Sequence, residues 1–328
     1  YKASQAAIAG VSSTAASVTT AKDAIAVAAG SADPAKALLG QTFTLTTGAD
    51  TFVGGSSADV FNALTVKADG SAATTLSAFD SIDGGAGNDT LNIYSDYKVG
   101  APATGNNNGL NGATVKNVET INIYNSNNGF GPVDASKFVG ATAINQVNIA
   151  NAVTGLAAGT TAGFNGTASS VIAAIDVTAA AAATSVSVNL TNAKGVDGGS
   201  VGTFDAGDNT VGLKVAGAAL NSVTVGGTIT QSVASVVPAQ AANLALAVSG
   251  STTATSFSLN TSVDTALTLT GMTAVTSVDA AASVGGVSFN GTTQVQTITT
   301  GAGKDVVQSA FVTTASKGAT ISTGAGND

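Results

Sequence analysis

A nine-residue unit recurs in a single frame near the start of this chain and leaves few folds open to it. Residues 84–92 read Gly-Gly-Ala-Gly-Asn-Asp-Thr-Leu-Asn, a complete match to the pattern G-G-x-G-x-D-x-U-x, in which U is a large apolar residue. The units at 45–53, 54–62 and 75–83 keep the same frame, and residues 63–74 interrupt the series. Each unit predicts a six-residue turn and a three-residue strand, so that successive turns lie on opposite sides of a flat parallel roll.

The aspartates and glycines of these units are candidate calcium ligands. Glycine adopts backbone conformations that would strain other residues and lets carbonyl oxygens point inward, while aspartate supplies charge for a hard cation. Turns on the same side are two units apart, so we expect Asp50 to share an ion with Asp80, and Asp59 with Asp89. The expected metal ligands of this block are Gly48, Asp50, Gly54, Gly55, Asp59, Asp80, Asp83, Gly84, Gly85, Gly87 and Asp89.

Two more copies of the turn pattern lie near the other end of the sequence, at 300–307 and 323–328, with Thr at the first position. We interpret them as the opening turns of a second calcium block. Their candidate ligands are Gly301, Gly303, Asp305, Gly324, Gly326 and Asp328. The alternative is that all these motifs are ordinary Gly/Asp turns, which a Gly-rich chain produces often.

Composition argues against several other functions. The chain has no Cys and no His, so it lacks the usual zinc ligands and a proton shuttle for neutral pH. Its 11 basic residues are scattered lysines within a net charge of −8, which disfavours a nucleic-acid partner. No apolar run reaches the roughly 18 residues of a membrane-spanning helix, so no membrane insertion is expected. Without His a metalloprotease motif is impossible, and we expect no enzymatic activity.

Four regions are expected along the chain. Residues 1–39 are Ala-rich, and Asp33-Pro34 before a short Leu-containing run predicts a helical leader. Residues 40–94 are the calcium-binding roll, residues 95–299 a Thr/Val/Ala-rich solenoid-like region, and residues 300–328 the truncated second calcium block. The predicted fold class is therefore all-β, a parallel β-roll or β-solenoid with calcium-binding turns and a short helical N-terminal leader.

Strand spacing in the third region also indicates stacked rungs. Alternating apolar segments begin at Val223, Leu244, Leu267 and Val287, which are 21, 23 and 20 residues apart. Such intervals are close to one rung of a solenoid. The alternative is a β-sandwich whose strands recur at similar intervals.

The nine-residue units resemble the hemolysin-type (RTX) calcium-binding repeats of proteins exported by type I secretion. Residues 115–123, Val-Lys-Asn-Val-Glu-Thr-Ile-Asn-Ile, look like the rung that follows such repeats in the S-layer proteins of Caulobacter and Campylobacter fetus. Residues 133–138 are similar to the same proteins. The resemblance implies export in an unfolded state, folding outside the cell where calcium is abundant, and assembly into a lattice on the cell surface.

The expected function is accordingly that of a secreted, calcium-stabilised S-layer subunit. Its expected partners are other copies of the chain and a cell-surface polysaccharide. An RTX-type adhesin is the alternative, and a polysaccharide-degrading β-helix enzyme is a remote one, since such lyases commonly rely on Arg or Lys in an acidic cleft.

Overall fold

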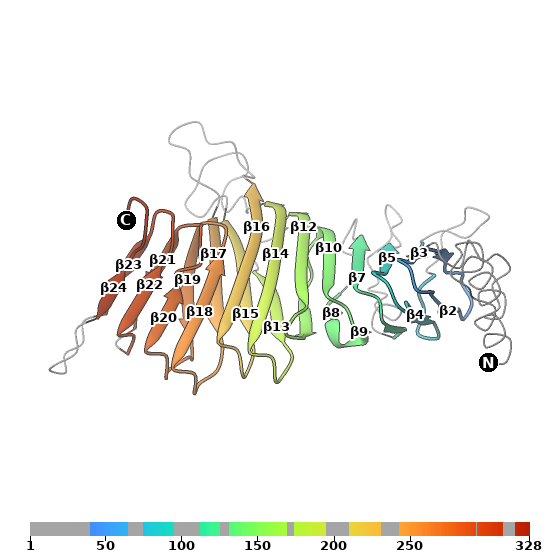
Figure 1. Ribbon diagram of the computed structural model, residues 1–328, viewed down its shortest axis with the longest axis horizontal. Helices are drawn as coiled ribbons and strands as arrows, with labels where there is room; N and C mark the ends of the chain where they lie inside the picture. The colour runs from blue at the N-terminus through green and yellow to red at the C-terminus, as the bar shows by residue number, and fades with distance from the viewer. Residues whose placement is uncertain are drawn as a thin grey trace, which may run out of the picture.

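The computed structural model describes residues 40–64, 75–94, 112–124, 131–168, 174–194, 210–230, 243–292, 294–310 and 319–328. Within these ranges the chain is all-β, and every paired strand is parallel to its neighbours, as predicted for a solenoid or roll. The rungs follow one another along the long axis of the molecule (Figure 1). The predicted helical leader at 1–39 and most of the interruption at 63–74 lie outside the described residues.

One face of the stack is a 12-stranded sheet, called here the long sheet. Its strands, in spatial and sequence order, are β1 (Thr42–Thr44), β3 (Val60–Ala63), β5 (Thr90–Tyr94), β7 (Thr120–Tyr124), β10 (Ala143–Ile149), β12 (Thr161–Ala168), β14 (Ser185–Lys194), β16 (Ser222–Thr230), β18 (Ser256–Thr261), β20 (Ser277–Ala280), β22 (Thr297–Thr300) and β24 (Thr320–Ser322).

The intervening strands form two further sheets. A four-stranded sheet contains β2 (Thr51–Val53), β4 (Ser81–Asp83), β6 (Thr114–Lys116) and β9 (Phe138–Val139). An eight-stranded sheet contains β8 (Val133–Asp134), β11 (Val153–Leu156), β13 (Ile175–Ala179), β15 (Thr210–Ala216), β17 (Asn243–Ser249), β19 (Thr265–Thr270), β21 (Val287–Asn290) and β23 (Val306–Gln308). The change from one sheet to the other occurs at the 3-10 turn η1 (Ala135–Lys137), which joins β8 to β9.

The predicted alternation of turn and strand is confirmed in the first block. Strands β1, β2 and β3 begin nine residues apart, at Thr42, Thr51 and Val60, and β4 and β5 begin nine residues apart as well. Register pairs Phe52 with Ile82 and Phe61 with Leu91, so the U positions of units on the same side stack directly. The strands therefore keep the frame that the sequence predicts.

The core is the line of inward-facing side chains between the sheets. Phe61, Leu91, Ile121 and Ile144 are in register on four successive rungs of the long sheet and have no exposed surface. Burying each such side chain contributes about 1.5–3 kcal/mol to folding. Because these rungs repeat the same arrangement, the core keeps the strands in register and so aligns the turns that precede them.

On the outer face of the long sheet, an asparagine ladder crosses four rungs. The side-chain amides of Asn92, Asn122 and Asn145 each donate to the side-chain oxygen of the asparagine one rung earlier, at 3.0 Å, beginning with Asn62. On the same strands, the rings of Tyr94 and Tyr124 stack with centroids 4.6 Å apart. These contacts reinforce the register next to the nonapeptide turns.

The stacked-rung interpretation of the later region holds, with one correction. Leu244, Leu267 and Val287 begin or lie in β17, β19 and β21, which are neighbours in the eight-stranded sheet. Val223 belongs instead to β16 in the long sheet. Its spacing from Leu244 resembles a full rung because the connection from Thr230 to Asn243 is long, although the two strands lie in different sheets.

Candidate metal centre

Strand register brings together turns that are two units apart. Turn 45–50 precedes β2 and turn 75–80 precedes β4, and these strands pair through Thr51 and Ser81. Turns 54–59 and 84–89 precede β3 and β5, which pair through Val60 and Thr90. The stacking that would let Asp50 share an ion with Asp80, and Asp59 with Asp89, is therefore present, and the sharing of ions stays a prediction.

Each stacked pair is joined by a backbone N–H that donates to the acid of the next rung. The Asp50 N–H donates to Asp80 Oδ1 at 2.9 Å, and the Asp59 N–H donates to Asp89 Oδ1 at 2.7 Å. The pattern continues one rung further, because the Asp89 N–H donates to Glu119 Oε2 at 2.7 Å. Asp59, Asp89 and Glu119 form a regular series of acids, called here the acidic ladder.

Glu119 is the site residue that sequence reasoning missed. It was interpreted as part of a Val-Glu-Thr pattern and was not assigned a role at a metal. The signal that identifies it is spacing, since residues 59, 89 and 119 are each 30 positions apart. The interruption 63–74 and the segment between β5 and β6 obscure this regularity in the sequence.

The pair Asp50 and Asp80 has its carboxylate oxygens satisfied within the protein. Thr46 donates its N–H to Asp50 Oδ2 at 2.7 Å and its hydroxyl to Asp50 Oδ1 at 3.0 Å. The Ser77 N–H donates to Asp80 Oδ2 at 2.6 Å. Gly48 has only the Thr46 hydroxyl near the position of a β-carbon, at 3.6 Å. These hydrogen bonds stabilise both turns without requiring a cation.

The pair Asp59 and Asp89 differs in this respect. Asp59 accepts from the Gln41 and Gly55 N–H groups, both at 2.6 Å. Asp89 has no exposed surface, and its Oδ2 atom is buried without a hydrogen-bond partner. Burial raises the pKa of Asp89, the N–H of Asp59 opposes the increase, and the charges of Glu119 and Asp59 add to it. An ionised Asp89 therefore lacks a compensating positive charge.

The glycines of these turns let carbonyl oxygens of the stacked turn approach the backbone closely. Gly85 and Gly87 have φ values of 90° and 138°, which other residues rarely adopt. A β-carbon on Gly85 would lie 2.5 Å from the Gly55 carbonyl oxygen and 3.0 Å from that of Gly54. On Gly54 it would collide with the Gly84 carbonyl oxygen and Asp59 Oδ2. Carbonyl and carboxylate oxygens are the ligands that calcium prefers, so this donor set fits the ion.

No group of three or more acidic side chains suited to a metal occurs within the described ranges. A calcium ion between turns 54–59 and 84–89 would therefore take most of its ligands from backbone carbonyls and water. Such a site would depend on turn geometry as well as on charge.

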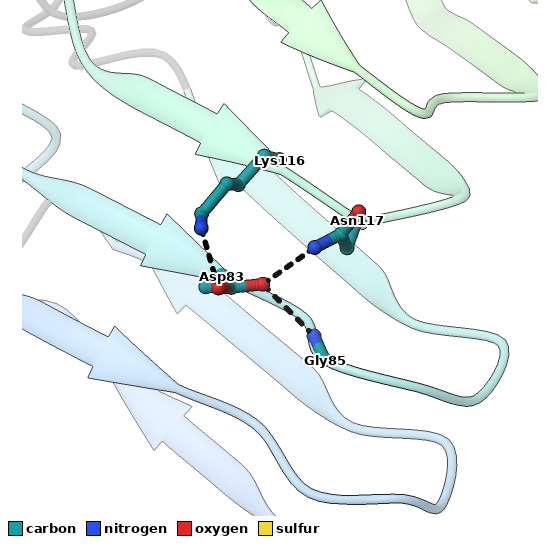
Figure 2. A network of polar contacts seen from close by, with 4 residues as sticks. All are labelled: Asp83, Gly85, Lys116 and Asn117. Carbon is teal, nitrogen blue, oxygen red and sulfur yellow. Dashed lines mark hydrogen bonds and ion pairs between the residues drawn. The ribbon is translucent and has the colours of Figure 1, made fainter.

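Asp83, also a predicted ligand, has other partners. Lys116 Nζ lies 2.8 Å from its Oδ2 atom, while Asn117 Nδ2 and the Gly85 N–H donate to its Oδ1 atom at 2.8 and 3.2 Å (Figure 2). The hydrogen bond from Lys116, followed by that from Asn117, lowers the pKa of Asp83. These contacts fasten residues 116–117 to the strand and turn of the preceding rung.

The two C-terminal turns also stack on one another. Ala302 and Ala325 form a parallel bridge, and the Asp305 N–H donates to Asp328 Oδ1 at 3.1 Å. Asp305 is buried and accepts from the Val287 N–H at 2.7 Å and the Thr300 hydroxyl at 2.6 Å. Gly303 and Gly326, with φ of 121° and 148°, match Gly87 in conformation, and β-carbons on Gly301 and Gly324 would meet carbonyl oxygens.

Comparisons of the chain with protein-family models, with curated proteins and with solved structures found no significant match. In the part of the chain that the structure describes, no helix has the length and apolar character needed to cross a membrane.

Proposed function

We propose that this chain is a calcium-stabilised structural protein of the bacterial cell surface, acting as an S-layer subunit outside the cell. The observation that carries the proposal is the stack of turns 54–59 and 84–89. There, carbonyl oxygens of the glycines and the buried carboxylates of Asp59 and Asp89 lie close together, because glycine lets the two turns pack backbone against backbone. Calcium bound between these turns would neutralise charges that the folded chain otherwise leaves uncompensated.

Binding of this kind adds directly to folding stability. Extracellular calcium modules have dissociation constants of about 10⁻⁴ to 10⁻³ M. At a calcium concentration ten times such a constant, each site would stabilise the fold by about 1.4 kcal/mol. A chain with these sites would be less stable in a low-calcium cytoplasm and would fold fully after export.

The architecture supports a structural role. The long sheet runs through 12 parallel strands, and its core repeats from rung to rung. Solenoids of this kind present extended lateral surfaces, which suit repeated contacts between identical copies. The S-layer proposal also draws on the resemblance of residues 115–123 to the rung that follows RTX repeats in such proteins. Contacts to a surface polysaccharide are part of the same proposal.

The adhesin alternative draws on a groove over the outer face of the eight-stranded sheet. Its volume is about 540 Å³, and it crosses β11, β13, β15, β17 and β19. Asp176 and Lys214 lie in this groove on adjacent rungs, together with Thr154, Thr178 and Ser249. Most of the groove's lining is apolar, so it would suit a ligand that presents an apolar face together with a few hydroxyl groups.

Electron microscopy of the complete chain, dialysed into calcium or into a chelator, tests the proposed function. We expect ordered two-dimensional sheets in calcium and dispersed particles after chelation. Calcium-bound particles that stay single at high protein concentration, and that bind to glycan-coated beads, would favour the adhesin. Sheets that form equally well in chelator would contradict a calcium-stabilised lattice.

A further inference from the structure

The unpartnered oxygen of Asp89, Oδ2, lies beside Gly84 in its own turn, where the rung formed by β6 and β7 passes close by. Asp89 Oδ1 reaches back to the Asp59 N–H, whereas Oδ2 lies 2.5 Å from the position that a β-carbon on Gly84 would occupy. That same β-carbon would collide with the carbonyl oxygen of Asn117. Asp89 Oδ2 and the Asn117 carbonyl oxygen thus both lie close to Gly84, and glycine at this position permits that approach.

Glu119 brings a second carboxylate to the same turn. Its Oε2 atom is 2.7 Å from the Asp89 backbone nitrogen, which places its negative charge beside the buried Asp89 side chain. The cation of this segment, Lys116, is paired with Asp83 and makes no hydrogen bond to Asp89 Oδ2. Asp89 Oδ2, the Glu119 carboxylate and the Asn117 carbonyl oxygen therefore all lie at this turn, and no hydrogen-bond donor compensates Asp89 Oδ2. A buried arrangement of this kind requires a cation or a proton.

Asn117, which lies between β6 and β7, is held in place so that its carbonyl oxygen could bind a cation. Asn117 has a left-handed backbone with φ of 53°, and its side-chain amide donates to Asp83 Oδ1 at 2.8 Å. Its N–H donates to the Val139 carbonyl at 2.8 Å, which ties it to β9 (Figure 2 shows the Asp83 side of this network). The Asn117 carbonyl is thus fixed from both neighbouring rungs and needs little reorganisation to bind an ion.

We propose that a further calcium ion binds between residues 84–89 and 117–119, with Asp89 Oδ2, the Glu119 carboxylate and the Asn117 carbonyl oxygen as protein ligands. Water completes the coordination, since calcium takes six to eight oxygens. This site lies outside the nonapeptide pattern, and it rests on the proposed function in assuming that the roll binds calcium. It extends the ion series by one rung and fastens the nonapeptide block to the β6–β7 rung.

The test is the number of calcium ions bound per chain, measured by equilibrium dialysis and elemental analysis of the complete protein. Glu119→Gln keeps a side-chain oxygen for the Asp89 N–H but removes the charge. We expect it to bind one ion fewer than the wild type, or to bind that ion at least tenfold more weakly. Asp176→Asn, which removes an acid on β13 away from both sets of acidic turns, is the control and is expected to keep every ion.

Asp59→Asn separates this inference from the function proposed above. If Asp59→Asn loses an ion while Glu119→Gln binds calcium as the wild type does, the site at 117–119 is refuted and the nonapeptide site stands. If the wild type binds no calcium, both proposals fail. Circular dichroism of each variant in calcium-free buffer confirms that a lost ion is not a lost fold.

Discussion

Asp89 combines complete burial with a carboxylate oxygen that has no hydrogen-bond partner. Leaving an ionised group in this condition is costly, because water is removed and nothing replaces its interactions. The neighbouring acids on the ladder increase the cost. A cation beside Asp89 Oδ2 would remove this cost. We therefore expect Asp89 to couple folding to metal binding more directly than Asp50 and Asp80, whose carboxylate oxygens accept hydrogen bonds within the protein.

The substitution Asp89→Asn tests that coupling. Its side-chain oxygen can still accept from the Asp59 N–H, while the new amide group can donate toward the Asn117 carbonyl oxygen. Without calcium, we expect the variant to be more stable than the wild type by about 1–3 kcal/mol at neutral pH. With calcium the order should reverse. Urea unfolding in both buffers measures this, and a loss of stability in both would contradict the role given to Asp89.

The pH dependence of stability follows from the same residue. The folded-state pKa of Asp89 lies above its ordinary value of 3.8, so the ionised form is disfavoured in the fold. Calcium-free stability should therefore fall as pH rises from 3.8 through that raised pKa. Asp83 has a lowered pKa, so its contribution is complete above 3.8, is lost only as pH falls through the lowered value, and stays constant over this window.

The comparison that isolates Asp89 is the difference in urea midpoint between the wild type and Asp89→Asn, in buffers stripped of calcium by a chelating resin. We expect the advantage of the variant to grow with pH over that window and to level off above the raised pKa. A difference that is constant with pH would show that Asp89 is not the group that titrates.

At the scale of the element, the nonapeptide turn depends on glycine where the backbone of the next turn passes close by. Gly87 has φ of 138°, and a β-carbon there would lie 2.6 Å from the Ser57 carbonyl oxygen and 2.7 Å from its carbon. Gly87→Ala should therefore cost about 1–3 kcal/mol and weaken calcium binding. Thermal unfolding with and without calcium measures both effects.

Gly48→Ala is the control for this substitution. Gly48 occupies the same kind of turn, but it lacks a left-handed φ and its nearest neighbour would be the Thr46 hydroxyl at 3.6 Å. We expect a change within about 0.5 kcal/mol. Equal losses in the two variants would indicate that the turn tolerates no side chain at all, rather than that the packing of turn on turn is the cause.

Turns and strands of the first block were predictable because each nonapeptide specifies its own conformation locally. Gly and Asp mark the turn, and a single U residue such as Leu91 marks the strand. Which sheet each strand joins was not predictable, because apolar and polar residues alternate in the same way in the strands of every sheet. Val223 was misplaced for that reason. Glu119 was missed because it meets Asp89 only when β7 pairs with β5, and the residues before β7 do not follow the nonapeptide pattern.

At the scale of the whole molecule, each rung contacts only its neighbours, so stability is a sum of local terms. The described acidic turns of the two predicted calcium blocks lie at residues 45–119 and 300–328, while the strands from β10 to β17 stack without an acidic residue in the described turns between them. Loss of calcium should therefore loosen the ends of the stack more than its middle.

Hydrogen exchange resolved by peptide measures this directly. After chelation we expect amides of β3, β5 and β7 to lose protection, while those of β14, β16 and β17 change little. A uniform loss along the chain would mean that the solenoid unfolds as one cooperative unit. Protection that is unchanged at every strand would mean that the acidic turns are fully stable without an ion.

The most direct test of calcium-dependent folding is thermal unfolding of the complete chain, followed by circular dichroism during titration with calcium and reversal with EGTA, and with magnesium as the control ion. We expect the melting temperature and the β signal to rise with calcium, to fall again with EGTA and to respond little to magnesium, and Asp59→Asn to reduce the calcium response. A melting temperature that is the same in calcium, magnesium and EGTA would contradict the proposal that these turns bind calcium.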